Sequence, residues 1–213
     1  IFTQALEDEI VEDSPVHRLK GLKVEKKAPE ILTAAQIIAL LDSVPQKHKG
    51  IIALAAYAGL RATEIFQIQW RDIDFENSVV TVTPGDDKSV KSGIFRKIPM
   101  RPSLVDILEA HRRAPSFKAK VISAAFGDRL VFPNPQGKSY KTINKTLNKA
   151  AIDLDIPKIR LHQLRHTFGS LALMNGADVR TVSKWMGHAN LVTTMRYLHT
   201  SVEHERQVMN GFG

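Results

Sequence analysis

The chain has 213 residues, 43% of them hydrophobic, so it is large enough to bury a core and to form one or two domains. Thirty Lys and Arg residues against 22 Asp and Glu give a net charge of +8, which favours polyanionic partners, nucleic acid first. No apolar run is long enough to span a membrane, and the absence of cysteine excludes disulfides, a thiolate nucleophile and a cysteine-ligated zinc site.

The first 27 residues are interpreted as the trailing end of an N-terminal domain followed by a linker. An acidic cluster at 7–13 precedes the basic segment HRLKGLKVEKK at 17–27. The chain opens at Ile1 rather than Met and shows no signal peptide, which indicates a fragment of something longer. The absence of cysteine fits a reducing cytoplasm. Residues 28–213 are expected to form a second domain.

Three helices are predicted at the start of this second domain, at about 33–41, 47–58 and 62–69. Thr33 and Gln36 have the spacing of a capping box, in which each side chain bonds the backbone N–H of the other residue. Gly59 follows the second helix, where a left-handed residue commonly ends a helix.

The hydrophobic period then changes from that of a helix to that of strands. Segments with β-branched residues and partial alternation lie at 72–75, 78–83 and 94–100. A turn at Glu76–Asn77 and a charged loop at 84–93 separate them. These features predict a small three-stranded antiparallel sheet.

Helical patterns return after the sheet, at about 102–113, 140–154, 162–174, 178–186 and 191–199. Gly176 and Gly187 occupy positions where helix C-caps are expected. The predicted fold class is therefore α+β, mostly α-helical with one small antiparallel sheet.

The segment HQLRH at 162–166 has a histidine spacing that can bind zinc, because residues four apart share one helix face. Zinc proteases place a glutamate directly after the first histidine, whereas this chain has Gln163. No third ligand follows in register. A zinc hydrolase is therefore an alternative that the sequence disfavours.

Arg165 gives the same segment a different chemistry. It follows His162 by three residues, so one helix side carries both an imidazole and a guanidinium. A guanidinium binds phosphate through two hydrogen bonds and keeps its charge at every relevant pH. Arg61 is the best candidate for a second guanidinium, and Glu64 can orient it; an ordinary surface ion pair with Glu64 is the alternative.

Tyr197 is the candidate nucleophile. If Asn190 caps the last helix, its apolar stripe is predicted to consist of Leu191, Met195 and Leu198. Tyr197 would then lie off this stripe, on the side of Thr193, which weakens a pure packing role. His188 lies in the turn before the cap, where a ring nitrogen can point at a neighbouring group.

Together these motifs resemble the tyrosine recombinase family, also called lambda-type phage integrases. GLRATEIFQIQWRDIDF at 59–75 resembles the family's first arginine box. HQLRHTFGSLALMNGADVRTVSKWMGHANLVTTMRYLH at 162–199 resembles its second. The resemblance covers about residues 30–200 and implies the catalytic-domain fold of this family, preceded by the end of a core-binding domain.

The family also uses a lysine on a β-hairpin. Lys91 in VKSGIFRKIPM matches the pattern of a Lys-Ser/Thr-Gly turn that leads into a strand ending in Ile-Pro. Lys88 is the rival candidate, and Lys97 is disfavoured because it lies inside the predicted strand.

The resemblance implies DNA strand transfer without metal, cofactor or ATP, through a 3′-phosphotyrosyl intermediate. Six residues share this chemistry: Tyr197 as nucleophile, His162 as acceptor of its proton or acting through the phosphate, Arg61 and Arg165 on the phosphate oxygens, His188 as a hydrogen-bond donor to a non-bridging oxygen, and Lys91 as the acid for the leaving 5′-oxygen. An unassisted phenol has a pKa near 10, so it needs such help at neutral pH.

The resemblance also implies double-stranded DNA as the partner and a homotetramer of the full-length protein on DNA. A C-terminal segment such as 202–209 would pass between protomers. Two alternatives keep the same residues: a DNA-binding module that does not cleave, and a relative of type IB topoisomerases that shares the cleavage chemistry.

Overall fold

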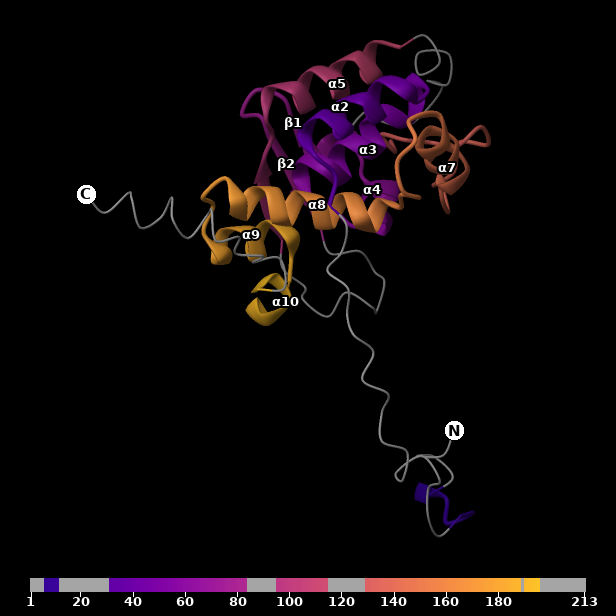
Figure 1. Ribbon diagram of the computed structural model, residues 1–213, viewed down its shortest axis with the longest axis vertical. Coiled ribbons are helices and arrows are strands. Elements are labelled where there is room, and N and C mark those ends of the chain that lie inside the picture. The colour runs from indigo at the N-terminus through magenta and orange to yellow at the C-terminus, as the bar shows by residue number, and fades with distance from the viewer. Residues whose placement is uncertain (1–5, 12–30, 84–94, 115–128, 189, 196–213) are drawn as a thin grey trace, which may run out of the picture.

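The computed structural model describes residues 6–11, 31–83, 95–114, 129–188 and 190–195. Helices form the body of this part of the chain, and a small sheet lies at one side (Figure 1). The helices are α2 (Ala34–Ser43), α3 (Gln46–Ala58), α4 (Ala62–Gln67), α5 (Pro102–Arg113), α7 (Asn144–Asp153), α8 (Leu161–Met174), α9 (Val179–Met186) and α10 (Leu191–Met195). The strands are β1 (Ile73–Asp74), β2 (Val79–Val82) and β3 (Arg96–Pro99).

The sheet is antiparallel in the order β1-β2-β3, which confirms the predicted fold class. Val80 lies opposite Ile73 on one side and Ile98 on the other, and all three side chains are buried. Because side chains alternate between the two faces of a strand, Arg96 lies on the same inward face as Ile98. This placement brings a charged residue into the core.

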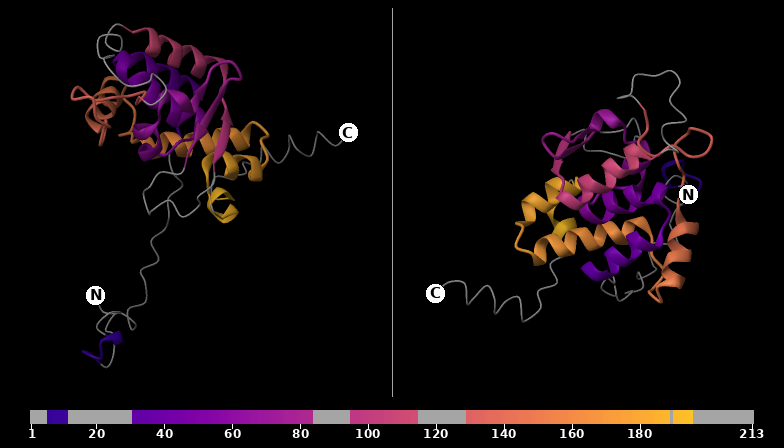
Figure 2. Two further views of the ribbon diagram at one scale, coloured as in Figure 1. Left: turned by 180° about the vertical axis from the view of Figure 1, so that it is seen from behind. Right: turned by 90° about the horizontal axis from the view of Figure 1, so that it is seen from above.

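Helix α3 is the centre of the fold. Its run IIALAA is buried on all sides, which is typical of a helix enclosed by others. Helices α5 and α8 pack against it and lie on either side of it in Figures 1 and 2. None of the described helices is long and apolar enough to span a membrane.

The capping and C-cap predictions are confirmed. Thr33 and Gln36 exchange the two hydrogen bonds of a capping box, at 2.9 and 3.2 Å. Gly59 and Gly187 end α3 and α9 in the left-handed conformation, with φ of 65° and 64°. Gly176 also has a positive φ, directly after the C-cap residue of α8.

The predicted helix at 62–69 is too long by two residues. Ile68 and Gln69 are extended because they pair with a distant segment: the N–H of Val131 donates to the carbonyl of Ile68 at 2.9 Å. The predicted strand at 72–75 is likewise shorter, since Trp70–Asp72 forms a 3-10 turn, η1. The sequence contains no local signal for such long-range pairing.

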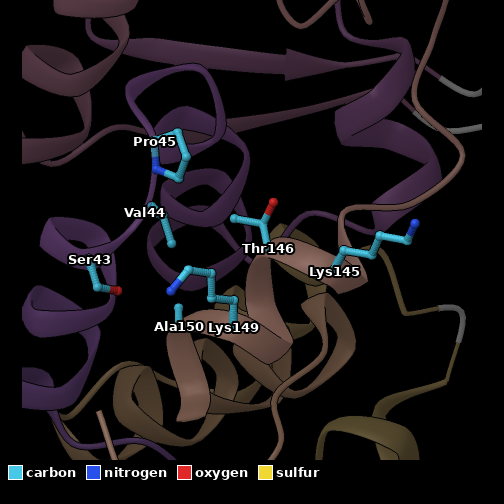
Figure 3. Close-up of a pocket in the computed structure, with 7 residues that line it drawn as sticks. All are labelled: Ser43, Val44, Pro45, Lys145, Thr146, Lys149 and Ala150. Atoms are coloured by element: carbon cyan, nitrogen blue, oxygen red, sulfur yellow. The ribbon is translucent and has the colours of Figure 1, made fainter. Parts of the chain in front are cut away.

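The helix predicted from residue 140 begins only at Asn144. Tyr140 is held outside it by the buried His48, whose Nε2 lies 3.3 Å from the tyrosine hydroxyl. Nδ1 of the same histidine lies 2.9 Å from Oγ1 of Thr146, so one imidazole joins α3 to α7. A pocket of about 510 Å³ lies beside this contact, and Figure 3 shows that it is lined by residues 43–45 and by Lys145, Thr146, Lys149 and Ala150.

The predicted apolar stripe of the last helix is wrong for the residues that the structure describes. Leu191 and Met195 are 41% and 53% exposed. The buried residue of α10 is Thr194, and it shares a hydrogen bond with His188. Leu198 and Tyr197 lie outside the described residues.

Replacement of Gly59 by Ala is expected to destabilise the protein strongly. An L-residue in the left-handed region costs roughly 1–2 kcal/mol, and the new Cβ would overlap the ring of Phe168, which adds roughly 1–3 kcal/mol of overpacking. Gly137→Ala is the matched control, since its φ is 78° and its Cβ would meet no atom within 4 Å. Urea unfolding should show a larger loss for Gly59→Ala, and equal losses would contradict this account.

Candidate active site

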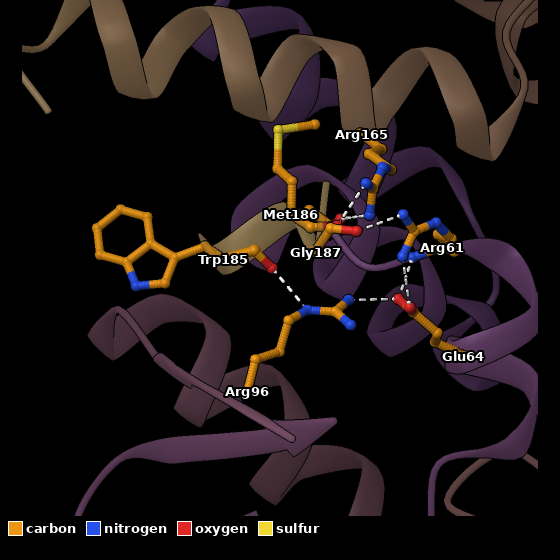
Figure 4. A network of polar contacts seen from close by, with 8 residues as sticks. Arg61, Glu64, Arg96, Arg165, Trp185, Met186 and Gly187 are labelled. Atoms are coloured by element: carbon orange, nitrogen blue, oxygen red, sulfur yellow. Dashed lines mark hydrogen bonds and ion pairs between the residues drawn. The ribbon is translucent and has the colours of Figure 1, made fainter. Parts of the chain in front are cut away.

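Three guanidiniums converge on the carbonyl end of α9, as Figure 4 shows. Each donates to one of three consecutive backbone carbonyls. The pairs are Arg96 Nε with Trp185 O at 2.8 Å, Arg165 Nη2 with Met186 O at 2.5 Å, and Arg61 Nη2 with Gly187 O at 2.7 Å. The arginines come from β3, from α8 and from the residue that caps the start of α4.

The end of a helix explains this convergence. The last carbonyls of a helix have no partner within it, and they form the negative end of the helix dipole. Gly187 turns the chain away in the left-handed conformation, so the arginines can reach these carbonyls. A Cβ on Gly187 would lie only 2.9 Å from Nη1 of Arg96.

Glu64 joins two of the arginines. Its Oε1 accepts from Nη1 of Arg61 at 2.9 Å, and its Oε2 accepts from Nη2 of Arg96 at 2.6 Å and from the backbone N–H of Arg61 at 2.7 Å. Burial alone would raise the pKa of Glu64, but Arg96 and Arg61 outweigh burial and hold the pKa below its ordinary value. The predicted contact between Arg61 and Glu64 is therefore confirmed, and the same carboxylate also pairs with Arg96.

Arg165 is more deeply buried in the protein than its position on the same helix side as His162 suggested. It is only 2% exposed, and its Nη1 donates to the carbonyl of Gly59 at 2.6 Å. One guanidinium thus joins the C-terminal ends of α3 and α9, both of which end at a left-handed glycine.

His162 and His166 form a close pair on α8, with their Nε2 atoms 2.8 Å apart. Burial, and then the neighbouring charges, lower the pKa of both, that of His166 to about 4. His166 was not among the predicted site residues, although the HxxxH spacing placed the two rings together. Within the described part of the chain, no group of three or more His, Asp or Glu side chains has an arrangement suited to a metal ion.

His188 follows the three carbonyls directly and is held by α10. Its Nδ1 lies 2.8 Å from Oγ1 of the buried Thr194. Burial, and then the charges of Arg165 and Arg61, lower the pKa of His188 to about 4. This imidazole is therefore neutral at neutral pH and sits beside permanent positive charges.

The structure brings four of the six predicted site residues together: Arg61, His162, Arg165 and His188. Lys91, its rival Lys88 and Tyr197 lie outside the described residues, and their roles stay predictions. Sequence reasoning missed Arg96 and Thr194. Strand alternation was the available signal for Arg96, since it places this charge on the buried face.

The arrangement presents fixed cations beside neutral imidazoles, a combination that can bind a phosphate group and move protons around it. Residues 25–204 match the model of the phage integrase family. The chain belongs to this family. It is a tyrosine recombinase catalytic domain, as the two arginine boxes predicted.

Similar proteins carry the same assignment. Tyrosine recombinase XerA of Thermococcus onnurineus is 31% identical over 198 residues, which cover 92% of this chain and 67% of that protein. Tyrosine recombinase XerD of Staphylococcus saprophyticus is 26% identical over 219 residues, which cover 98% of this chain and 70% of that protein. The chain thus spans about two thirds of the length of these relatives.

Solved structures show the same fold. A crystal structure of XerA recombinase matches with a TM-score of 0.72 at 22% identity, over 87% of this chain and 66% of that one. The integrase of the Tn1549 transposon, in complex with a circular intermediate DNA, matches with a TM-score of 0.76 at 21% identity, over 98% of this chain and 74% of that one.

The neutral imidazoles predict a loss of stability in mild acid. Folding lowers the pKa of His166 and His188 from 6.5 to about 4, so the unfolded chain binds more protons than the folded chain between these values. The stability that these neutral imidazoles contribute is fully present above pH 6.5, the pKa of the unfolded chain, and it is lost as the pH falls toward 4. The melting temperature should therefore decrease between about pH 7 and pH 5.

The control is the double variant His166→Asn/His188→Asn, in which this decrease should be smaller. A decrease as steep as that of the parent chain would show that these imidazoles do not carry the effect.

Proposed function

We propose that this chain cuts and rejoins double-stranded DNA at specific sites, with Tyr197 as nucleophile and without metal or ATP. The observation that carries the proposal is the cluster of three guanidiniums and neutral imidazoles at the end of α9. Tyr197 follows His188 by nine residues in the sequence. The net charge of +8 supports a polyanionic substrate.

Arg61 and Arg165 would bind the non-bridging oxygens of the phosphate to be cut. The side chain of Arg61 is 33% exposed, and two of its nitrogens are fixed by Glu64 and Gly187. A guanidinium held in this way needs little reorganisation when charge develops on the phosphorus. Arg165 is buried, so the phosphate would meet it at the floor of the site.

The imidazoles would handle the protons of the reaction. His162 and His188 are neutral before DNA binds because burial and the arginines disfavour their charged forms. A phosphate would compensate the arginine charges and raise both pKa values. His162 could then accept the proton of the phenol, while His188 donates a hydrogen bond to a non-bridging oxygen.

The bond changes balance without an external energy source. The Tyr197 oxygen bonds to phosphorus, the bond from phosphorus to the 5′-oxygen breaks, and Lys91 supplies the proton to that oxygen. Attack by a 5′-hydroxyl of a partner strand reverses these changes and restores Tyr197. The number of phosphodiester bonds is therefore conserved.

The partners and the cellular setting of the protein belong to the same proposal. Solved relatives include XerH recombinase bound to its difH substrate and the Tn1549 integrase bound to DNA. We infer that the full-length protein acts on duplex DNA as a homotetramer in the cytoplasm. A mobile element such as a phage or transposon is the inferred source.

Tyr197→Phe is expected to abolish a covalent protein–DNA adduct, because phenylalanine lacks the attacking oxygen. The adduct is measured by denaturing electrophoresis on a nicked duplex from which the released strand diffuses away. The chain has three tyrosines, so Tyr57→Phe and Tyr140→Phe are matched controls that should still form the adduct. EDTA should leave it unchanged. An adduct that persists in Tyr197→Phe would refute the assignment.

Lys91→Ala should slow cleavage by about 10²–10⁴-fold, the usual contribution of a general acid. A substrate with sulfur in place of the 5′-bridging oxygen should restore the rate, since a thiolate leaves without a proton. Lys88→Ala is the control and should cleave both substrates like the parent. If the sulfur substrate rescues Lys88→Ala instead, the rival lysine is the acid.

A further inference from the structure

We propose that Arg96 is a positioning residue for strand cleavage: it braces Glu64 against the carbonyl end of α9 and so holds Arg61 ready for the phosphate, without touching DNA itself. The inference rests on the function proposed above. It concerns a residue outside the six that carry the predicted chemistry.

Two nitrogens of the Arg96 guanidinium are engaged inside the protein. Nε donates to the carbonyl of Trp185 at 2.8 Å, and Nη2 donates to Oε2 of Glu64 at 2.6 Å. The residue is 6% exposed. Its guanidinium packs directly beneath Gly187, where a Cβ would lie 2.9–3.2 Å from three of its atoms. Arg61, whose side chain is 33% exposed, is therefore more accessible to a DNA phosphate than Arg96.

The contacts of Arg96 with Glu64 and Trp185, here called the brace, connect three elements that are far apart in the sequence. Arg96 is the first residue of β3, Glu64 lies in α4, and Trp185 lies in the last turn of α9. Glu64 in turn fixes Arg61, whose other Nη group reaches Gly187. Arg96 thus closes a ring of hydrogen bonds that sets the distance between Arg61 and the turn before His188 (Figure 4).

Arg96 also sets the net positive charge of the site. Arg61, Arg96 and Arg165 carry three positive charges, and Glu64 carries one negative charge. Without Arg96, the buried carboxylate would have only Arg61 as a charged partner, so the ion pair would cancel the charge that Arg61 offers to a phosphate. With Arg96 in place, Glu64 orients Arg61 without neutralising it.

Arg96→Met tests the brace in the complete chain. Methionine keeps much of the volume but removes the charge and both hydrogen bonds. We expect the single-turnover rate of adduct formation at saturating DNA to fall by about 100-fold, as when a residue supports the transition state. The DNA dissociation constant, measured by fluorescence anisotropy, should change less than about threefold.

A pH profile separates a brace from simple loss of packing. In the parent chain burial raises the pKa of Glu64, but Arg96 and Arg61 lower it by more and keep the carboxyl ionised. Loss of Arg96 removes the larger of these two lowering influences, so the pKa of Glu64 should be higher in Arg96→Met than in the parent. As the pH falls, protonated Glu64 stops accepting from Arg61. The rate deficit of the variant relative to the parent should therefore be larger near pH 5.5 than near pH 8.

Two further variants complete the test. Arg96→Lys keeps the charge and one hydrogen bond, so it should recover about tenfold of the lost rate. Arg101→Met makes the same change outside the site, where Arg101 lies over the Tyr57 ring, and should cleave like the parent. Thermal unfolding shows whether Arg96→Met folds. If it does not, the cleavage rate of Arg96→Lys is compared with that of the parent chain instead.

The outcomes are distinguishable from a failure of the proposed function. If the parent chain forms no adduct, the proposed function falls and the brace falls with it. If the parent forms an adduct and Arg96→Met forms it equally fast, only the brace is overturned. A rate deficit that is constant with pH and is not reduced in Arg96→Lys would also overturn it.

Discussion

The carbonyl end of α9 is the feature on which the candidate site depends. A helix terminus leaves backbone carbonyls without partners, and here arginines from three distant elements satisfy three of them in succession. The left-handed Gly187 makes this possible, because it ends the helix without a side chain in the way of Arg96. The same contacts therefore complete the helix and assemble the cations, so stability and function share one set of hydrogen bonds.

The electrostatic character of the site follows from this assembly. The arginines keep their charge, and burial beside them leaves His166 and His188 neutral at neutral pH. Glu64 is the carboxylate of the network and is shared between Arg61 and Arg96. Excess positive charge in a partly buried place favours an anionic ligand, and a phosphate diester compensates it while allowing the imidazoles to take up protons.

Local patterns predicted the parts of the molecule that local interactions determine. The capping box at Thr33, the left-handed ends at Gly59 and Gly187 and the pairing of Arg61 with Glu64 each involve residues close in the sequence. The extended segment at Ile68 depends on a partner more than sixty residues away, and no local pattern indicates it.

The same distinction explains what sequence reasoning missed in the site. The contacts of Arg96 span 32 and 89 residues, so its role emerges only in the fold. The last helix shows the opposite failure: its apolar residues predicted a packed face, but the buried side carries Thr194, which shares a hydrogen bond with His188. The order of the arginine boxes nevertheless identified the family, because it depends on residue types and spacing rather than on contacts.

A crystal structure of this chain on duplex DNA, with vanadate at the cleavage position as a mimic of the five-coordinate phosphorus, tests the central claim most directly. The account predicts that nitrogens of Arg61 and Arg165 lie about 3 Å from vanadate oxygens. It also predicts that Arg96 keeps its contacts with Glu64 and Trp185. A complex in which Arg96 leaves these partners to bind the vanadate, or in which the arginines no longer contact the end of α9, would contradict it.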